Sequence, residues 1–529
     1  MEIHRSTENT ISTLLVFLLG LLFGLYFFVF NIIGFDFQFF PGDLGDARFN
    51  MYILEHAHKF LIGKESSLWD APFMFPEKSV ITYSDNLIGT TPFYTLFRLI
   101  GENRETAFQY WFVLMCSLNY LFGFLFFKDV FKNSYSAALG AFVFAFSLAL
   151  YSQISHAQTF PRFPLVLSFW MMFKYFNKQM AHHLFLSIFF LVYQFYCCLY
   201  LGFLLFVPLA LSLFFIFFSK REILLEKVKD KKYAIYIICS ILLNLILLLP
   251  LMLPYYYHTK KIGMHYFSEV VESIPTFLSY FSSVKGSLFW DFLSEINIKQ
   301  VAFWDHRIFI GIVSMSLLIC FLYKYFKHTI TEKKVGNNFE WLIFAVTIVT
   351  FILFFRLDKY TLYILLYKIP GFGSLRSITR IINVELLFVS FAVASFSNFI
   401  MKKYSNFSKI IFFSLLLFLV IDNYFYSKST HRTSKWLAQN RESKLIEKLK
   451  NVPKNSVISY EPSYIENSTI DYQIDAMLAA QTLDLICLNG YSSTSPPNYG
   501  KYWEHPDSLS RMEWLKNKDL GNKKIAVVH

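Results

Sequence analysis

The chain has 529 residues, of which 55% are hydrophobic, 20% are aromatic and only 16% are charged. Soluble globular proteins carry about 25% charged residues, so this composition excludes that class and indicates a protein with many membrane spans. The net charge of +12 could indicate nucleic-acid binding, but basic loops beside membrane spans explain the same charge.

Eleven segments are apolar and long enough to be predicted as membrane-spanning helices. The first follows an N-terminus with a single Arg and has no small-residue cleavage site, so we expect a retained span and not a signal peptide. The long run 183–219 is divided near Gln194–Gly202 because it exceeds one span. The predicted spans are 11–33, 106–127, 134–152, 163–177, 183–198, 200–219, 233–253, 308–326, 339–356, 380–400 and 408–426.

The loops between these spans predict how the chain is oriented in the membrane. With the N-terminus in the cytoplasm, every inner loop is short and rich in Lys, as the positive-inside rule requires. These loops are 128–133, 177–183, 219–232, 324–334 and 401–409. Most of the positive charge then lies on the cytoplasmic face of a multi-pass integral membrane protein, and the nucleic-acid interpretation loses its support.

The predicted fold is therefore mainly α, in two parts. Residues 1–426 form a polytopic membrane domain with two long outer loops, 34–105 and 254–307. Residues 427–529 form a small extracytoplasmic α/β domain, because strand-like pieces (SVISYE, DLICLNGY) alternate with helical ones (SKLIEKLK, DYQIDAMLAAQ). The second outer loop is expected to cover the site without taking part in chemistry.

The first outer loop opens with PGDLGDARF and carries two acids, Asp43 and Asp46. Apolar residues at helical spacing predict helices over 47–63 and 84–100, which we expect to lie in the membrane interface. Asp46 and a further acid, Asp85, would then stand near the two N-caps. Helix capping alone accounts for both acids.

A catalytic base must in addition reach a substrate hydroxyl in a sheltered pocket, and the aromatic-rich loop could provide that shelter. Asp43 is the alternative base, since neighbouring carboxylates can raise each other's pKa.

Two other places carry polar residues at the predicted outer boundary of the membrane. The short loop 153–162 holds His156, Gln158 and Arg162, which indicate either a functional site or simple loop polarity with a snorkelling Arg. Arg376 and Arg380 are four residues apart, so they are predicted to share one face at the start of a helix.

An Arg fork and a free helix N-terminus both suit a phosphate. The outer position of Arg376 and Arg380 runs against the usual charge bias. Either the phosphate of a substrate or ordinary lipid phosphates would account for them, and Glu385 could instead neutralise one of them.

Five blocks of the sequence occur in an order that resembles bacterial multi-span glycosyltransferases of the GT-C superfamily, in particular an uncharacterised group with a GD-x-GD opening. The blocks are GDLGDARFNMYILEH, LWDAPFMFPEKSVITYSDNLIGTTPFY, ISHAQTFPRFPLVL, KIPGFGSLRSITRI and LNGYSSTSPPNYG. The last block offers Asn489 and Tyr491 as amide and hydroxyl groups suited to a sugar, although a plain turn explains it equally well.

This resemblance implies an enzyme that moves a sugar from a polyprenyl-phosphate donor to a glycan, lipid or protein acceptor at the outer face of the cell membrane, with inversion. An acid of the first outer loop then serves as base or orients the acceptor, and Asp46 is preferred over Asp43. Asp85 matches a second acid, and His156 with Gln158 matches a His-x-Gln pair. Many members need no metal and some bind a divalent ion, so no metal ligand is assigned.

Two other functions also require many spans and basic phosphate contacts. A transporter or flippase of a lipid-linked sugar would show inverted repeats and acids near the membrane midplane. Here the notable carboxylates cluster outside the spans instead, which favours an enzyme. A surface-glycan polymerase or ligase is not separated by composition, but the ordered GD-x-GD block favours the GT-C resemblance.

Overall fold

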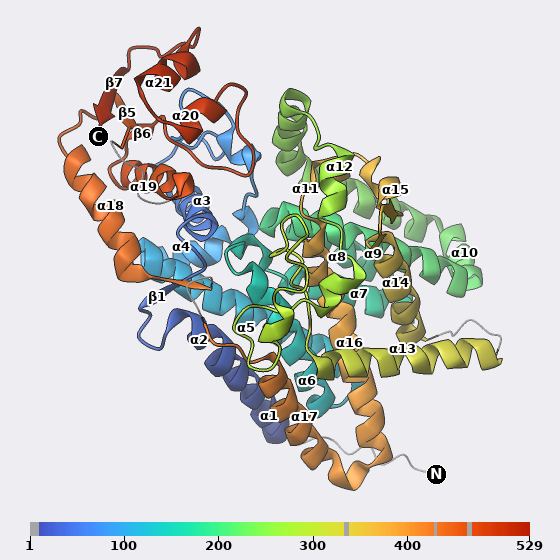
Figure 1. Cartoon of the computed structure of the whole chain (residues 1–529). Coiled ribbons are helices and arrows are strands. Elements are labelled where there is room, and N and C mark those ends of the chain that lie inside the picture. Colours follow the sequence, from blue (N-terminus) through green and yellow to red (C-terminus); the bar gives the residue numbers. More distant parts are fainter. Residues whose placement is uncertain (1–9, 333–337, 428–430, 463–467) are drawn as a thin grey trace.

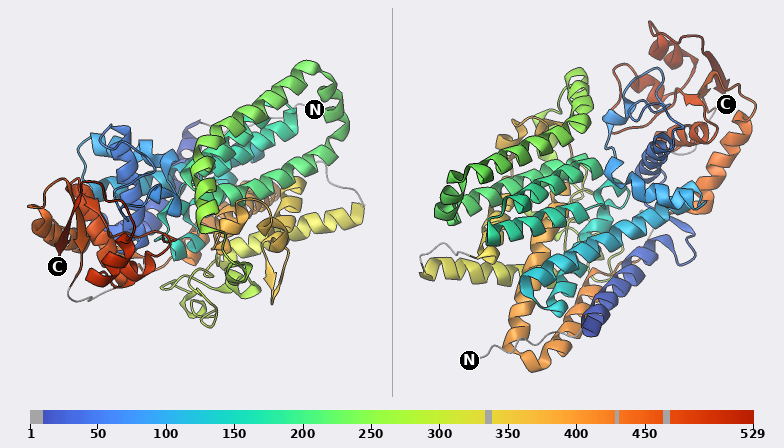
Figure 2. Two further views of the ribbon diagram at one scale, coloured as in Figure 1. Left: turned by 90° about the horizontal axis from the view of Figure 1, so that it is seen from above. Right: turned by 180° about the vertical axis from the view of Figure 1, so that it is seen from behind.

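The computed structural model describes residues 10–332, 338–427, 431–462 and 468–529. It consists of a large bundle of helices with a smaller group of helices and strands at one end (Figure 1). We call the described residues 431–529 the C-terminal unit. In every view this unit lies beside the helices of the first outer loop (Figure 2).

All eleven segments predicted to span the membrane are helical. Within the described residues, seven continuous helical stretches are long and apolar enough to cross a membrane, which supports a multi-pass membrane protein. The count of eleven spans remains a prediction, since α7, α8 and α14 have only 16, 17 and 15 residues. The helices at these positions are α1 (Thr10–Gly24), α2 (Phe30–Ile33), α5 (Arg104–Phe131), α6 (Ser134–Phe146), α7 (Phe163–Lys178), α8 (Ala181–Cys197), α9 (Leu199–Ser219), α11 (Lys231–Ile262), α13 (Ile312–Glu332), α14 (Phe339–Leu353), α16 (Ile382–Lys403) and α17 (Ser408–Asn423).

Helices α6 and α16 form the centre of the bundle, where they pack against each other and are almost wholly buried. Helix α11 lies at the outside and leaves most of its Leu and Ile side chains exposed, as contact with lipid requires. Three short helices occupy connecting segments: α10 (Arg221–Lys229), α12 (Phe267–Glu272) and α15 (Tyr363–Tyr367). A two-residue hairpin, β2 (Arg356–Leu357) with β3 (Tyr360–Thr361), precedes α15.

The division of the apolar run 183–219 is confirmed. Helix α8 ends at Cys197 and α9 begins at Leu199, with Cys198 extended between them (φ −161°, ψ 114°). The break is stabilised from outside the run, because the backbone N–H of Leu199 donates to Asp85 Oδ1 at 2.7 Å. A residue of the first outer loop thus satisfies one of the free N–H groups at the start of α9.

The first outer loop contains the two predicted helices, α3 (Asp46–Leu61) and α4 (Thr91–Leu99). The expectation that α3 lies in the membrane interface is wrong, because all residues from Ala47 to His58 are buried inside the protein. Its polar side chains find partners there: Glu55 pairs with Arg98 at 2.9 Å, and His58 Nδ1 lies 3.2 Å from the Thr95 hydroxyl. Helix α4 exposes Leu96 and Leu99, and its interfacial position remains a prediction.

The C-terminal unit contains the strands and helices that the sequence predicted there. Its parallel sheet has the order β6–β5–β7, formed by Ile486–Cys487, Ser456–Tyr460 and Lys524–Val528. Its helices are α18 (Lys435–Leu449), α19 (Thr469–Thr482), α20 (Gly500–Glu504) and α21 (Ser508–Leu515). That residues 427–529 form a separate domain outside the membrane remains a prediction.

The C-terminal unit and the first outer loop are joined by backbone pairing. Strand β4 (Arg432–Ser434) pairs antiparallel with β1 (Phe39–Pro41). At the edge of the parallel sheet, Cys487 N–H donates to Pro72 O at 3.0 Å and Phe75 N–H donates to Cys487 O at 3.1 Å. The loop therefore extends the sheet, and the two parts of the chain form one body.

Candidate active site at the GD-x-GD loop

The two glycines of GDLGD allow close packing on both sides of the loop. Gly42 has φ +88°, and a Cβ there would lie 2.7 Å from Ala47 Cβ and 3.0 Å from Ser155 Cα. A Cβ at Gly45 would lie 3.0 Å from Ile470 of α19. Any side chain at Gly42 would therefore move the loop away from Ser155, the neighbour of His156.

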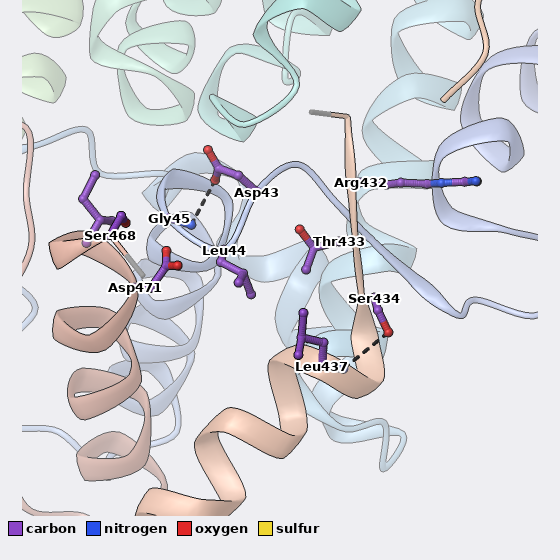
Figure 3. Close-up of a pocket in the computed structure, with 10 residues that line it drawn as sticks. Asp43, Leu44, Gly45, Arg432, Thr433, Ser434, Leu437, Ser468 and Asp471 are labelled. Atoms are coloured by element: carbon purple, nitrogen blue, oxygen red, sulfur yellow. Dashed lines mark hydrogen bonds between the residues drawn. The ribbon is translucent and has the colours of Figure 1, made fainter. Parts of the chain in front are cut away.

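Capping of α3 belongs to Asp43 and not to Asp46, which corrects the sequence interpretation. Helix α3 begins at Asp46 itself, and Asp43 Oδ1 accepts hydrogen bonds from the N–H groups of Gly45 at 3.1 Å and Ala47 at 3.3 Å. Asp43 also lines a cavity of about 480 Å³ against the C-terminal unit, on the same side as Asp471 and across from Thr433 (Figure 3). Burial, followed by the charge of Asp46, raises the pKa of Asp43.

Both carboxylate oxygens of Asp46 contact side chains from distant parts of the chain. The phenol of Tyr491 donates to Asp46 Oδ1 at 2.5 Å, and His156 Nδ1 lies 3.3 Å from Asp46 Oδ2. The side chain of Asp46 is 31% exposed, so part of it is open to a substrate. Because Asp43 satisfies the helix terminus, Asp46 is free to take part in these contacts.

The surroundings of Asp46 favour its ionised form. Burial alone would raise its pKa, but the hydrogen bond and charge of His156, the bond from Tyr491 and the charge of Arg380 together lower the pKa to about 2. Asp46 is therefore a carboxylate throughout the neutral pH range.

His156 stands between two carboxylates. Its Nδ1 faces Asp46, and its Nε2 lies 3.9 Å from Asp305 Oδ1 in the second outer loop. Asp305 Oδ2 accepts a hydrogen bond from the Ser377 hydroxyl at 3.1 Å. A chain of polar contacts thus runs from Ser377 through Asp305 and His156 to Asp46.

Arg380 completes the cluster on the side of the membrane bundle. Its guanidinium lies over the ring of Tyr200, 4.5 Å from the centroid. Its charge acts on Asp46, Asp305 and Asp85, and its side chain is buried. A buried guanidinium whose charge reaches the partly exposed Asp46 suits an anionic group of a substrate bound there.

Arg376 lies nearby but not on the same helix face, which corrects the sequence prediction. The segment containing both arginines is a 3₁₀ turn (Ile378–Ile381) preceded by extended chain, and α16 starts only at Ile382. The backbone N–H of Arg376 donates to the Tyr200 hydroxyl at 2.6 Å, which fixes this extended conformation. The exposed Arg376 side chain acts electrostatically on Tyr491 and so remains near the site.

The fold is already known from a solved protein. No family model and no curated protein sequence matches the chain. The chain shares the fold of an archaeal oligosaccharyltransferase. The apo crystal structure of the Archaeoglobus fulgidus oligosaccharyltransferase matches with a TM-score of 0.50 and 10% identity, over 92% of this chain and 65% of that chain.

A second structure of that oligosaccharyltransferase, tethered to an acceptor peptide with the NVT sequon, matches with a TM-score of 0.48 and 11% identity, over 91% and 64% of the two chains. The chain thus spans less than two thirds of the length of the oligosaccharyltransferase. At this identity the match establishes the fold alone, and the assignment to the GT-C superfamily remains a prediction. Membership of the GD-x-GD group remains a prediction.

Asp85 caps α9 and not α4, the helix for which the sequence predicted it as a cap. It precedes α4 by several residues, and its carboxylate accepts from Leu199 N–H at 2.7 Å and from the Cys198 thiol at 3.0 Å. Burial raises the pKa of Asp85, while these hydrogen bonds and the charge of Arg380 oppose the rise. Asp85 therefore holds the start of α9, from which Tyr200 supports Arg380.

Gln158 and Glu385 are not brought into the cluster by any hydrogen bond. Gln158 is buried, and its Oε1 accepts no hydrogen bond from the described residues. Glu385 accepts from the Tyr280 hydroxyl at 3.0 Å, so it does not pair with Arg380. The role of Gln158 in substrate binding remains a prediction.

The carboxylates and His156 do not converge on one point. His156 Nδ1 faces Asp46 and His156 Nε2 faces Asp305, so the two acids lie at opposite edges of the imidazole ring. A single ion could not bind both carboxylates and a nitrogen of this ring in this arrangement. In the parts of the chain that the structure describes, no group of three or more His, Cys, Asp or Glu is arranged to hold a metal ion. The arrangement in this structure does not fit a bound divalent ion.

Sequence reasoning missed Asp305 and Tyr200 and gave Tyr491 no preference over a turn residue. Asp305 stands in a loop to which no chemistry was assigned, and Tyr200 lies within an apolar run. For Asp305 the available signal was the charged FWDHR block just before a predicted span. Only the fold brings Tyr491 to Asp46, Asp305 to His156 and Tyr200 to Arg380, each more than 140 positions apart in the sequence.

Proposed function

We propose that the protein is a membrane glycosyltransferase that moves a sugar from a polyprenyl-phosphate donor to a glycan, lipid or protein acceptor at the outer membrane face. The observation that carries this proposal is that His156 contacts both Asp46 and Asp305, while the charge of the buried Arg380 acts on both acids. These four residues come from four separate segments of an oligosaccharyltransferase-like fold. The acids favour an acceptor hydroxyl or amide, and the arginine favours a phosphate.

Asp46 acts on the acceptor in this proposal. The acceptor oxygen or nitrogen attacks the anomeric carbon, and its proton passes to the Asp46 carboxylate. A carboxylate with a pKa of about 2 is a weak base for a neutral hydroxyl. The acceptor atom becomes strongly acidic once its bond to the sugar forms, so proton transfer occurs late in the step. Before that, ionised Asp46 orients the acceptor.

Arg380 acts on the leaving group. As the bond between the anomeric carbon and the phosphate oxygen breaks, its electron pair stays on the lipid phosphate. A fixed, desolvated guanidinium stabilises the growing negative charge. The stacking of Arg380 on Tyr200 fixes the guanidinium before the reaction begins. Arg376, exposed beside it, binds the same phosphate from the outside. Attack on the face opposite the phosphate inverts the anomeric centre.

The function is tested with purified protein in detergent, a panel of radiolabelled polyprenyl-phosphate sugars and a membrane extract as acceptor. For at least one donor of the panel, we expect the radiolabel to move from the lipid fraction to a larger product. Flipping of the lipid in vesicles without transfer would instead support a transporter. Joining of preassembled glycan chains without single-sugar transfer would support a polymerase or ligase.

Replacement of Arg380 by Ala is expected to lower kcat/KM for the donor by about 100-fold or more, because one fixed charge at the leaving group is lost. Arg380→Lys should recover part of this loss, since Lys keeps the charge but not the planar fork. Initial rates over a range of donor concentrations provide the measurement. Arg432→Ala is the matched control, because Arg432 also stacks on an aromatic ring, at 3.9 Å from the Phe39 centroid. Equal losses in the Arg380 and Arg432 variants would contradict the assignment.

A further inference from the structure

We propose that Tyr491, supplied by the C-terminal unit, is a positioning residue that holds the Asp46 carboxylate in the orientation required for transfer. This inference rests on the proposed function of Asp46 as the residue that receives the acceptor. It assigns to the C-terminal unit a direct part in the active site, in addition to packing.

The contact itself is short and directional. The Tyr491 hydroxyl donates to Asp46 Oδ1 at 2.5 Å, which is the length of a strong O–H···O⁻ hydrogen bond. Burial and the charge of Asp46 raise the pKa of Tyr491, so the phenol keeps its proton and remains a donor. Since His156 faces Oδ2, the carboxylate is held at both oxygens and cannot rotate freely.

The backbone that carries Tyr491 is held by its own contacts. Asn489 exchanges hydrogen bonds with the backbone of Tyr460, donating to its O at 3.0 Å and accepting from its N–H at 2.8 Å. The N–H of Gly490 donates to Gln473 Oε1 at 3.0 Å. These bonds fix the residues before Tyr491 to the sheet and to α19.

Beyond Tyr491, the chain is fixed to the first outer loop. The Ser493 hydroxyl donates to the backbone oxygen of Tyr83 at 2.6 Å, and the Thr494 hydroxyl donates to the same atom at 3.2 Å. The Tyr491 ring contacts Phe49 of α3 edge to face, at 5.4 Å between centroids. The phenol is therefore held on both sides at a fixed place relative to α3, the helix that Asp46 begins.

This geometry separates two roles for Tyr491. The ring packs on Phe49, and Tyr491→Phe would preserve this packing. The hydroxyl contacts Asp46, and only this contact is lost in Tyr491→Phe. A role through Asp46 predicts that the effect of this variant disappears once Asp46 itself is changed, because interacting residues are not additive.

The experiment is a double-mutant cycle on the full chain with Tyr491→Phe, Asp46→Asn and both together. We expect Tyr491→Phe to lower kcat by about 10-fold to 100-fold, as for a misplaced catalytic group, with the donor KM unchanged. In the Asp46→Asn background it should cause no further loss. Transfer by Tyr491→Phe within twofold of the wild type, or an equal loss in both backgrounds, would overturn the proposal.

Thermal unfolding of the same four proteins gives a readout that does not need activity. The fall in melting temperature caused by Tyr491→Phe should be larger when Asp46 is intact than in the Asp46→Asn background, and equal falls would also overturn the proposal. Tyr502→Phe is the matched control, since its buried hydroxyl contacts Ser459 at 2.7 Å within the C-terminal unit. It should show no coupling to Asp46. Absence of transfer by the wild type would overturn the proposed function. The unfolding cycle would still show whether Tyr491 and Asp46 interact.

Discussion

Asp46→Asn is expected to lower sugar transfer by about 1,000-fold, within the range known for the loss of a general base. The amide keeps the size of the side chain, so the loop should keep its shape, but it lacks the charge that strengthens the hydrogen bond from Tyr491. The amide cannot take the proton from the acceptor, and it has no negative charge that would attract the acceptor. Single-turnover transfer with radiolabelled donor measures this loss without interference from product release.

Two further variants show whether position or charge causes the effect. Asp46→Glu keeps the charge but moves it by about one bond length, and we expect a loss of about 100-fold. Asp43→Asn removes the charge next to Asp46 but keeps a side-chain oxygen that can cap α3, so stability should change by less than about 1 kcal/mol. Transfer by Asp43→Asn should fall only a few-fold. If Asp43→Asn lost activity and Asp46→Asn kept it, Asp43 would be the base.

The Asp46→Asn variant should also carry a pH signature. The pKa of Asp46 is lowered from its ordinary 3.8 to about 2 in the folded protein. Its ionised form therefore stabilises the fold above about pH 4, and this contribution is lost as the pH falls through about 2. The difference in melting temperature between wild type and Asp46→Asn should narrow over this interval. If the difference in melting temperature stayed constant with pH, the surroundings of Asp46 would not lower its pKa.

The fold could be predicted from the sequence where local pattern decides the structure. Apolar runs and Lys-rich loops are local features, and each of the predicted spans is helical. The prediction that α3 lies in the membrane interface was wrong. It followed from a sequence with the charged face typical of a surface helix. That face is instead buried, with Glu55 paired to Arg98 and Arg48 paired to Asp475. Partners of this kind cannot be read from periodicity alone.

The site could be predicted only in part, for a similar reason. The cluster contains Asp46, His156 and Arg380, and each stands in a block with a polar group at an expected membrane boundary. Tyr491 comes from a segment with no such local signal, and Asp305, although it stands just before a predicted span, lies in a loop that was expected only to cover the site. Which acid caps and which acid faces the site depended on where α3 begins, and a shift of one turn exchanges the roles of Asp43 and Asp46.

The contact between the first outer loop and the C-terminal unit depends on a buried ion-pair network. Arg48 Nη2 lies 2.7 Å from Asp475 Oδ1, and Arg441 Nη2 lies 2.6 Å from Asp475 Oδ2. Arg48 and Asp475 are both buried, so a carboxylate left without one partner has little access to water. Removing one partner of a buried pair costs about 3–5 kcal/mol.

Arg48→Met is therefore expected to destabilise the protein by about 3 kcal/mol, the low end of that range, because Arg441 still pairs with Asp475. The melting temperature in detergent should fall by several degrees, and limited proteolysis should cut the C-terminal unit first. Transfer by the remaining folded protein should also fall, because Asp475 lies on α19, the helix whose Gln473 holds the backbone just before Tyr491.

Two comparisons identify the buried charge as the cause. Changing Arg48 and Arg441 to Met and Asp475 to Leu together removes all three charges of the network and should recover much of the lost stability. The exposed pair of Lys501 and Glu513, 2.7 Å apart in the same unit, is the control. Lys501→Ala should change stability by less than about 1 kcal/mol. If Lys501→Ala and Arg48→Met destabilised the protein equally, the C-terminal unit would be held by its general packing. The buried ion pair would then not be what holds Tyr491 in position.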